Sequence, residues 1–367
     1  MRALEALQAH FQGYVWKHVL SMLMGLMLQE GRPTLTALQA SESVATLSRT
    51  LNRYPWPLQQ MIAWRQRRIT QGLQQRFRHQ RGRRPTVYLI VDDTVVEKRG
   101  KKLPKLGYHF ASSLDKVVRG WDLVFAAVRV GKVTVPWTWR CYVNERFCEE
   151  ESFQKRTQLA VELIGTFVPP LASPVVVLVD STYCSAPVIE AATARGFTVV
   201  GWVRKDRLLA DERKAWDVDE ETISPLRGMT QPIKVVHRGR GQGRRTVIST
   251  ELGWGRAMIL RHLKSRWGIE VMFRILKEEF GLGACRCRGA MSLTRWVELV
   301  LWAYVLVALT RWGRRLKSPQ HRWRAVRTVW GRQLMEAVSD VRGWLATLVW
   351  VMASLLSFLD PSTGELA

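Results

Sequence analysis

The sequence predicts an α/β protein in which a mixed β-sheet is flanked by helices, and three observations support this fold class. Apolar runs rich in β-branched residues, each of strand length, occur at 86–92, 174–179 and 197–203. Helical stretches at 149–168 and 186–194 alternate with the last two runs, as expected when helices cover a sheet. The first 84 residues contain no convincing strand, so a helical region is expected at the N-terminus.

This N-terminal region, residues 1–84, is predicted to be a helical DNA-binding domain. The segment Phe11–Leu28 is apolar with helical spacing, and Pro33 lies just beyond its end. Two short helices are expected next, one that Thr34 caps and that ends at Ala40, and one at about Val44–Asn52. Short helices after a longer one are typical of small DNA-binding units, and generic helical packing explains them equally well.

The chain is strongly basic, which favours a polyanionic partner. Its 56 lysines and arginines outnumber 31 aspartates and glutamates, giving a formal net charge of +25. Residues 63–84 contain eight arginines and no acidic residue. A charge run is usually a solvated face, but the missing carboxylates favour phosphate contact. The residues expected to bind DNA are Arg65, Arg67, Arg68, Arg76 and Arg78, followed by Arg81, Arg83 and Arg84.

The α/β part begins near residue 85. Residues 121–130 and 132–142 predict two strands joined at Gly131, a plausible hairpin. Residues 204–250 are polar, glycine-rich and basic before a last strand at 245–250, which predicts a β-rich insertion. A long helix is expected at Gly255–Phe280. The expected divisions after residue 84 are 85–203 and 251–290 for the two parts of the core, 204–250 for the insertion, and 291–367 for a helical C-terminal region.

Aspartates stand at the ends of the two most apolar strands. Asp93 ends the run at 86–92 and Asp180 follows the run at 174–179. Ligands of α/β sheets gather at the carboxyl ends of strands, so both are candidate site residues. Asp92 either assists Asp93 or points to the opposite face of the sheet. We expect the second, because adjacent strand residues diverge.

A third carboxylate is expected on the helix that includes residues 263–277. At 100° per residue, Arg266, Glu270 and Lys277 form one stripe beside an apolar arc, so the helix can pack on the sheet and present them at its margin. On spacing alone, an ordinary Arg–Glu pair on a solvated face explains this stripe as well.

Three carboxylates at one site repel one another unless a cation neutralises them. Oxygen ligands without His or Cys suit Mg²⁺ or Mn²⁺ rather than zinc. Two such ions can activate an attacking oxygen and stabilise the leaving one in phosphodiester chemistry. The sequence therefore predicts catalytic and metal-binding roles for Asp93, Asp180 and Glu270, with Arg266 and Lys277 holding flanking DNA phosphates.

The segment Arg266-x3-Glu270-x6-Lys277 resembles the bacterial insertion-sequence transposases of the DDE type that have a Tyr-Arg-Glu-Lys signature. Leu263 stands where the signature tyrosine is expected. Asp93, which precedes Thr94, and Asp180 match the family's two aspartates. The resemblance extends over about residues 10–310.

This resemblance implies a ribonuclease H-like core interrupted by a β-rich insertion before the glutamate helix. It also implies a homodimer that uses divalent metal to nick the terminal inverted repeats of an element. The freed 3′-hydroxyl then attacks, often through a DNA hairpin, and later joins target DNA. Some relatives hold a flipped base with a tryptophan of the insertion, for which Trp216 and Trp254 are candidates, although core packing is the stronger explanation for each.

Three alternatives remain: another ribonuclease H-like nuclease or resolvase, a catalytically inactive DNA-binding derivative, and a membrane-associated protein. The last depends on the uncharged stretch Gly343–Leu359, for which we favour a buried helix over a membrane span. The five cysteines form no paired CxxC set, so neither a disulfide framework nor a zinc ribbon is expected. A cytoplasmic, nucleoid-associated protein with no membrane partner is the resulting expectation.

Overall fold

The computed structural model describes residues 9–28, 33–38, 42–78, 84–98, 103, 106–111, 115–148, 152–284 and 289–309. The apolar stretch at 343–359, Arg81 and Arg83 lie outside these residues. The chain forms two compact units, one made of Met1–His79, Arg99–Pro104 and Met272–Ala367, the other of Gln80–Lys98 and Lys105–Val271. The finer division expected from the sequence stays a prediction.

The first unit is helical where it is described. Its helices are α2 (Gly13–Leu28), α3 (Val44–Asn52), α4 (Leu58–Phe77) and α9 (Ala290–Leu309). The sequence predicted α2 and α3, but the short helix expected from Thr34 to Ala40 is wrong, because the described residues 34–38 form turns. Ser43 caps α3 by accepting a hydrogen bond from the Thr46 backbone N–H at 3.2 Å. By length and composition alone α9 could cross a membrane, but 83% of its apolar window is buried inside the protein. A buried core helix gives the same pattern.

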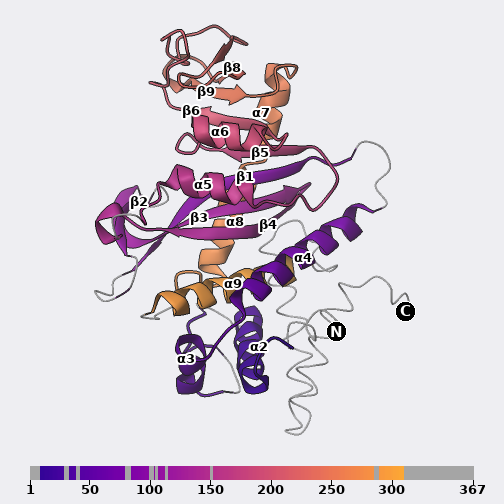
Figure 1. The fold of residues 1–367 in the computed structure, drawn as a ribbon, viewed down its shortest axis with the longest axis vertical. Coiled ribbons are helices and arrows are strands. Elements are labelled where there is room, and N and C mark those ends of the chain that lie inside the picture. The colour runs from indigo at the N-terminus through magenta and orange to yellow at the C-terminus, as the bar shows by residue number, and fades with distance from the viewer. Residues whose placement is uncertain are drawn as a thin grey trace. The chain divides into compact units, whose positions relative to one another are not determined.

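The second unit is built on a nine-stranded mixed sheet (Figure 1). Its strands are β1 (Val87–Glu97), β2 (Gly107–Ala111), β3 (Lys116–Val130), β4 (Val133–Tyr142), β5 (Val175–Val179), β6 (Thr198–Val203), β7 (Ile223–Pro225), β8 (Pro232–Arg238) and β9 (Arg245–Ser249). The order is β2-β3-β1-β5-β6-β9-β8-β7, and β4 also pairs with β3.

Five of these strands form a mixed sheet of the kind that the resemblance implies for the core. Strand β1 is antiparallel to β3 and parallel to β5, while β5 is parallel to β6 and β4 is antiparallel to β3. All five residues of β5 are buried, as the continuous apolar run indicated. The fold class is therefore confirmed: a mixed sheet flanked by helices.

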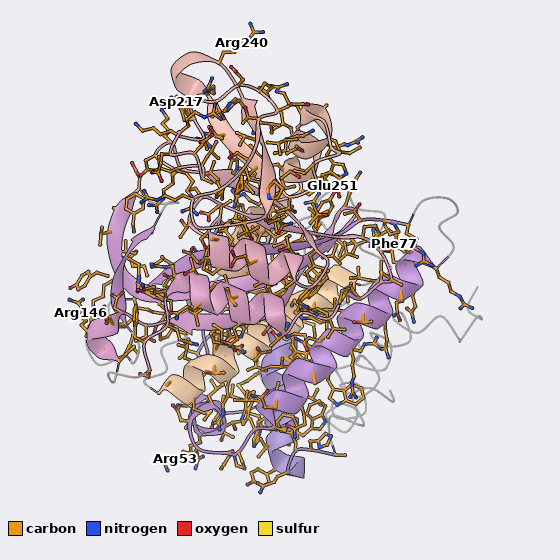
Figure 2. The ribbon with its side chains drawn as sticks, turned by 45° about the horizontal axis from the view of Figure 1, so that its top comes forward. Arg53, Phe77, Arg146, Asp217, Arg240 and Glu251 are labelled. Atoms are coloured by element: carbon orange, nitrogen blue, oxygen red, sulfur yellow. The ribbon has the colours of Figure 1, made fainter. Side chains whose placement is uncertain are left out.

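The region expected to be a β-rich insertion extends this sheet. Strand β9 pairs antiparallel with β6, β8 with β9, and β7 with β8. The segment between β8 and β9 carries Arg240, whose exposed side chain projects outward (Figure 2). The insertion therefore shares the core's sheet and adds basic side chains near its far edge.

Helices cover both faces of the sheet. Helices α5 (Arg156–Gly165) and α6 (Ala186–Thr193) lie together on one face (Figure 1). Helix α7 (Arg256–Lys264) is on the other face, where His262 Nδ1 lies 3.0 Å from the hydroxyl of Tyr88 on β1. Helix α8 (Trp267–Glu278) begins in this unit, and its residues from Met272 belong to the first unit.

The single long helix expected at Gly255–Phe280 is wrong, because the chain breaks between α7 and α8. The N–H groups of Ser265 and Arg266 bond to carbonyls three residues back, at 2.9 and 3.0 Å, which tightens the backbone into a turn. Helix α8 restarts at Trp267. The break directs Arg266 and the first turn of α8 toward the sheet.

Candidate active site

The candidate site lies where β1 and β5 separate. Their parallel pairing ends at Val91 and Val179, so Asp92, Asp93 and Asp180 follow directly. Strand β1 itself continues to Glu97 along β3, contrary to the expectation that it ends at this point. The edge that gathers the aspartates is therefore the end of the parallel pair rather than the end of β1.

Asp180 is fixed by a tight turn after β5. Its Oδ1 accepts hydrogen bonds from the backbone N–H groups of Thr182 at 2.9 Å and Tyr183 at 3.1 Å. The negative charge of Asp180 raises the pKa of both Asp92 and Asp93, which places it close to each.

Asp92 faces α7 and α8. Arg266 donates a hydrogen bond from Nη1 to its Oδ2 at 2.6 Å, and the same guanidinium forms an ion pair with Glu270 through Nη2. Burial raises the pKa of Asp92 to about 8; Arg266 opposes this shift, and Asp180 and Asp93 add to it. One guanidinium thus joins Asp92 to the glutamate of α8.

Asp93 faces the other side of the sheet. The hydroxyl of Tyr183 donates a hydrogen bond to its Oδ1 at 2.8 Å. Burial and then the charge of Asp122 raise its pKa to about 7, while the Tyr183 hydrogen bond and Arg156 oppose the shift. Asp93 therefore belongs to a second group of polar residues.

This second group is centred on the fully buried Asp122. Arg156 donates from Nε to Asp122 Oδ2 at 2.7 Å, and its Nη2 lies 3.3 Å from His109 Nδ1. Burial and the charge of Arg156 lower the pKa of His109 to about 4, so the imidazole is neutral near pH 7. The residues around Asp93 therefore also bond to one another.

The predicted carboxylates are only partly brought together. Asp180 lies near both β1 aspartates, and Arg266 links Glu270 to Asp92, whereas the contacts of Asp93 go to Tyr183 and the network of Asp122. The two aspartates do diverge, as expected. However, Arg266 contacts Asp92 and not Asp93, the aspartate chosen from the sequence, and no sequence spacing indicates that contact.

Within the described part of the chain, no three His, Cys, Asp or Glu side chains gather closely enough to hold a metal ion. The donor chemistry nevertheless fits Mg²⁺ or Mn²⁺, because the site is made of carboxylates whose mutual repulsion calls for a cation. In this arrangement, the guanidinium of Arg266 supplies that positive charge between Asp92 and Glu270.

Gly268 explains why the glutamate helix starts where it does. A Cβ at this position would lie 2.5 Å from Thr134 Oγ1 on β4 and would also meet the guanidinium of Arg129 on β3. Because Thr134 is short and buried, it cannot move aside easily. The missing side chain lets the first turn of α8 rest on the sheet, two residues before Glu270.

A basic cavity of about 850 Å³ opens beside Glu270. Leu263, in the position of the signature tyrosine, lines it, and so does Trp267, whose side chain is 55% exposed. Most of its cations were not predicted from the sequence, although Arg261 and Lys264 have the i, i+3 spacing of one helix face. The charged and aromatic residues of the lining are Arg238, Arg245, Arg261, Lys264, Arg266, Glu270, Trp202 and Trp267.

Arg65 does not have the role expected of it. Its side chain is fully buried in the first unit and forms an ion pair with the equally buried Glu298 of α9, with Nε and Oε2 3.1 Å apart. The expectation of phosphate contact rested on the missing acids nearby, but the acid is 233 residues away.

The other arginines of α4 are more accessible. Arg67 is exposed and lies over the Trp64 ring at 5.2 Å, and Arg78 is exposed beyond the helix. Arg68 donates to Gln71 at 2.9 Å and Arg76 is half-buried. Lys277, also half-buried, lies in the last turn of α8. Their contacts with DNA stay predictions.

Both tryptophans considered for a flipped base have partners within the protein. Trp254 stacks on His262 with ring centroids 4.2 Å apart. Lys205 and Arg244 lie over the Trp216 ring at 4.3 and 5.1 Å. These contacts support the packing explanation offered for each.

Fold and site together define the class: an α/β protein with a mixed sheet and acidic residues where its central parallel strands separate. Comparison with protein families agrees. The profile of the family described as DDE superfamily endonuclease matches residues 14–222, more than half of the chain, and that of the transposase DDE domain matches residues 155–306. The chain belongs to the DDE superfamily of endonucleases.

Two further comparisons were made. Among curated proteins there is no match. Among solved structures, the chain is similar to a piggyBac transposase in a cryo-EM synaptic complex with hairpin DNA, with a TM-score of 0.49 and 10% identity. The similarity covers 96% of this chain and 77% of that one. Our fold assignment comes from the strand order instead.

Proposed function

We propose that the protein is a bacterial insertion-sequence transposase that cuts DNA at terminal inverted repeats and joins the freed ends to target DNA. The observation that carries this proposal is the arrangement of Asp92, Asp180, Arg266 and Glu270 beside the basic cavity. Membership of the DDE superfamily and the net charge of +25 support nucleic acid as the substrate.

Asp180 and Glu270 are proposed as two of the catalytic carboxylates, with the third supplied by the β1 pair. The sequence favours Asp93 because Thr94 follows it. The ion pair with Arg266 favours Asp92, which shares that guanidinium with Glu270. We adopt Asp92 and keep Asp93 as the alternative.

The carboxylates would hold Mg²⁺ or Mn²⁺, as one ion or two. Bound there, the metal would help to activate water or a 3′-hydroxyl and stabilise the leaving oxygen. The chain's own cations bind DNA phosphates. Arg266 and the cavity arginines bind the phosphates beside the scissile bond, and Lys277 binds a phosphate further along α8.

The partners follow from this chemistry. The substrate is double-stranded DNA, both at the element's ends and at the target, and the active complex is a homodimer that pairs two ends. A bacterial cytoplasm, in association with the nucleoid, is the corresponding location.

The test is Mg²⁺- or Mn²⁺-dependent cleavage by the full chain of duplexes containing the inverted repeats that flank its gene. We expect nicks with 3′-hydroxyl ends. Asp180→Ala and Glu270→Ala should abolish nicking and leave binding of the ends intact. Cleavage retained by either variant would reject the assignment.

Binding without cleavage in wild type, over a range of metal concentrations, would instead favour an inactive transposase derivative. Leu263 in place of the signature tyrosine is the observation behind this second candidate. Cleavage of branched DNA but not of repeat ends would favour a resolvase.

A further inference from the structure

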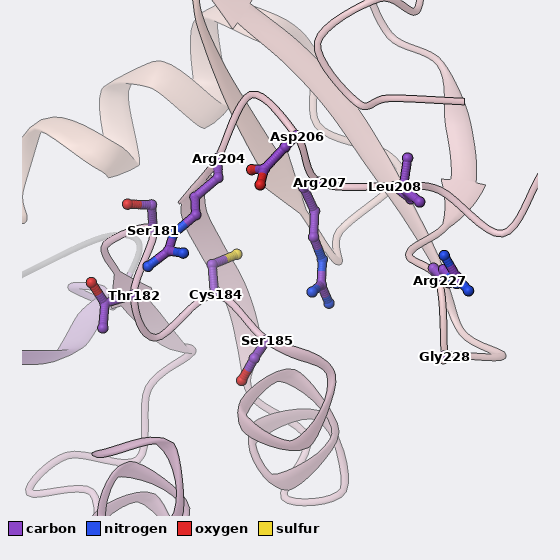
Figure 3. A pocket seen from close by; sticks show the side chains of 10 residues that line it. All are labelled: Ser181, Thr182, Cys184, Ser185, Arg204, Asp206, Arg207, Leu208, Arg227 and Gly228. Atoms are coloured by element: carbon purple, nitrogen blue, oxygen red, sulfur yellow. The ribbon is translucent and has the colours of Figure 1, made fainter. Parts of the chain in front are cut away.

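A second cavity, of about 590 Å³, lies on the unit that contains the sheet, and the proposed reaction does not use it. Three segments line it: residues 181–185 after β5, residues 204–208 after β6, and the turn at Arg227 and Gly228 (Figure 3). The first two follow the carboxyl ends of neighbouring parallel strands, where ligands of α/β sheets bind. Its volume suits one nucleotide and excludes a duplex.

The charge of this cavity is positive. Arg204 reaches toward Ser181 and Thr182, and Arg207 extends toward the start of α6 (Figure 3). Neither arginine forms an ion pair with a described residue. Arg227 is more than half exposed and pairs with Glu212 at 3.3 Å, and Asp206 is the acid of the lining.

Two buried polar atoms in the cavity wall have no hydrogen-bond partner among the described residues. They are the hydroxyl of Ser185 and the Nε of Arg207. Ser185 is the N-cap of α6 but makes no capping bond with its side chain. Buried donors usually find partners, and the start of a helix favours an anion. These two donors therefore point to an anionic ligand.

The thiol of Cys184 does not change the positive charge of the cavity. Burial raises its pKa to about 12, although Arg207 opposes the shift, so the group stays neutral near pH 7. It adds no negative charge to the lining.

The cavity begins next to the candidate catalytic residue Asp180. Ser181 and Thr182 follow it in sequence, and the N–H of Thr182 bonds to its carboxylate at 2.9 Å. A strand cut beside Asp180 therefore has an end near this cavity. Attack of water on the phosphorus forms one P–O bond and breaks the P–O3′ bond. The 3′-oxygen takes up a proton, and the other fragment retains a 5′-phosphate.

We propose that the cavity binds the 5′-phosphate end of a cut DNA strand, through Arg204, Arg207 and the Ser185 hydroxyl. This inference rests on the proposed function. A terminal phosphate carries more negative charge than an internal phosphodiester, and a chain end enters a small hollow more readily than a continuous strand. Both properties suit a cavity with three arginines.

The test is binding of the full chain, in EDTA, to two nicked duplexes of arbitrary sequence that differ only in a 5′-phosphate or 5′-hydroxyl at the nick. We expect wild type to prefer the phosphorylated nick about tenfold, the value of one charge-assisted hydrogen bond. Arg204→Gln and Arg207→Gln should each lose most of this preference, and Ser185→Ala part of it. Arg213→Gln is the matched control, because Arg213 is exposed and pairs with Asp211 outside the cavity.

Equal affinity of wild type for the two duplexes would overturn the proposal. So would equal losses for both duplexes in the Arg204 and Arg207 variants, which would indicate an internal phosphodiester. Inorganic phosphate that binds wild type as tightly as the phosphorylated nick would identify a free-anion site instead. Thermal melting checks that each variant folds. Because the assay needs no cleavage, its failure and that of the proposed reaction are distinguishable.

Discussion

The two adjacent aspartates of β1 are both half-buried but have different neighbours. On one face, Asp92 meets a single guanidinium, that of Arg266, which it shares with Glu270 beside the basic cavity. On the other face, Asp93 meets the Tyr183 hydroxyl and the network of Asp122, Arg156 and His109. Both carboxylates have raised pKa values, so burial alone does not distinguish them.

The two aspartates differ in how easily their bonding partners can be replaced. In the proposed reaction, Arg266 would turn from the carboxylates to a DNA phosphate, and Asp92 and Glu270 would then be available to a metal ion. The neighbours of Asp93 are tied to one another, so a change there costs several hydrogen bonds. We therefore assign exchangeable ligand chemistry to the Asp92 face and structural support to the Asp93 face.

The largest expected effect separates the two aspartates directly. Asp92→Ala should reduce metal-dependent DNA cleavage below detection, because it removes a proposed metal ligand. Asp93→Ala should reduce cleavage by roughly 10–100-fold, as for a residue that supports ligands. Cleavage rates under single-turnover conditions, with binding measured separately, provide the comparison.

The reverse result is equally informative. If Asp93→Ala abolishes cleavage and Asp92→Ala retains it, the assignment made from the sequence is correct and the division between faces fails.

A smaller effect is expected from Gly268, which seats the glutamate helix on the Asp92 face. Gly268→Ala adds a Cβ against Thr134 and should destabilise the protein by about 1–3 kcal/mol. It should also slow cleavage, because Glu270 is displaced. Gly165→Ala is the control, since nothing lies within 4 Å of a Cβ built there. Unchanged melting and cleavage in Gly268→Ala would show that α8 is not seated in this way.

The surroundings of Asp93 predict that the stability of the protein depends on pH. The folded-state pKa of Asp93, about 7, lies above its ordinary value of 3.8, so its contribution to stability is lost as pH rises through 7. Asp93→Asn removes this titration and the repulsion with Asp122. In EDTA it should raise the free energy of unfolding at pH 8 by on the order of 2 kcal/mol, and by much less at pH 5, as measured by thermal melting. Equal shifts at the two pH values would contradict the origin in ionisation.

The sequence predicted elements whose signals are local. Helix α3 was predicted at its observed bounds before the prolines at 55 and 57, and the structure adds the Ser43 cap at its start. Strand β5 followed from five consecutive apolar residues. Strand β2 was missed because its Gly-Tyr-His-Phe-Ala sequence has no long apolar run and is placed by pairing with β3.

Features that depend on distant contacts could not be predicted. The buried charge of Arg65 is explained by Glu298, far along the chain. The close approach of α8 to the sheet brings Gly268 against Thr134 and Arg129, which lie more than 130 residues earlier in the chain. The choice between Asp92 and Asp93 depends on which face meets Arg266, and no sequence spacing encodes that.

The smallest expected effect concerns Tyr183, whose fully buried hydroxyl donates to Asp93. Tyr183→Phe removes this hydrogen bond and leaves the ring, so the pKa of Asp93 should rise further. A loss of about 0.5–1.5 kcal/mol in stability is expected, with cleavage changed only slightly. Tyr108→Phe on β2 is the control, because Tyr108 is largely exposed. Melting curves and cleavage rates of both variants provide the measurement. If Tyr183→Phe lost as much activity as Asp92→Ala, the Asp93 face would take part in the chemistry. The two faces could then no longer be assigned separate roles.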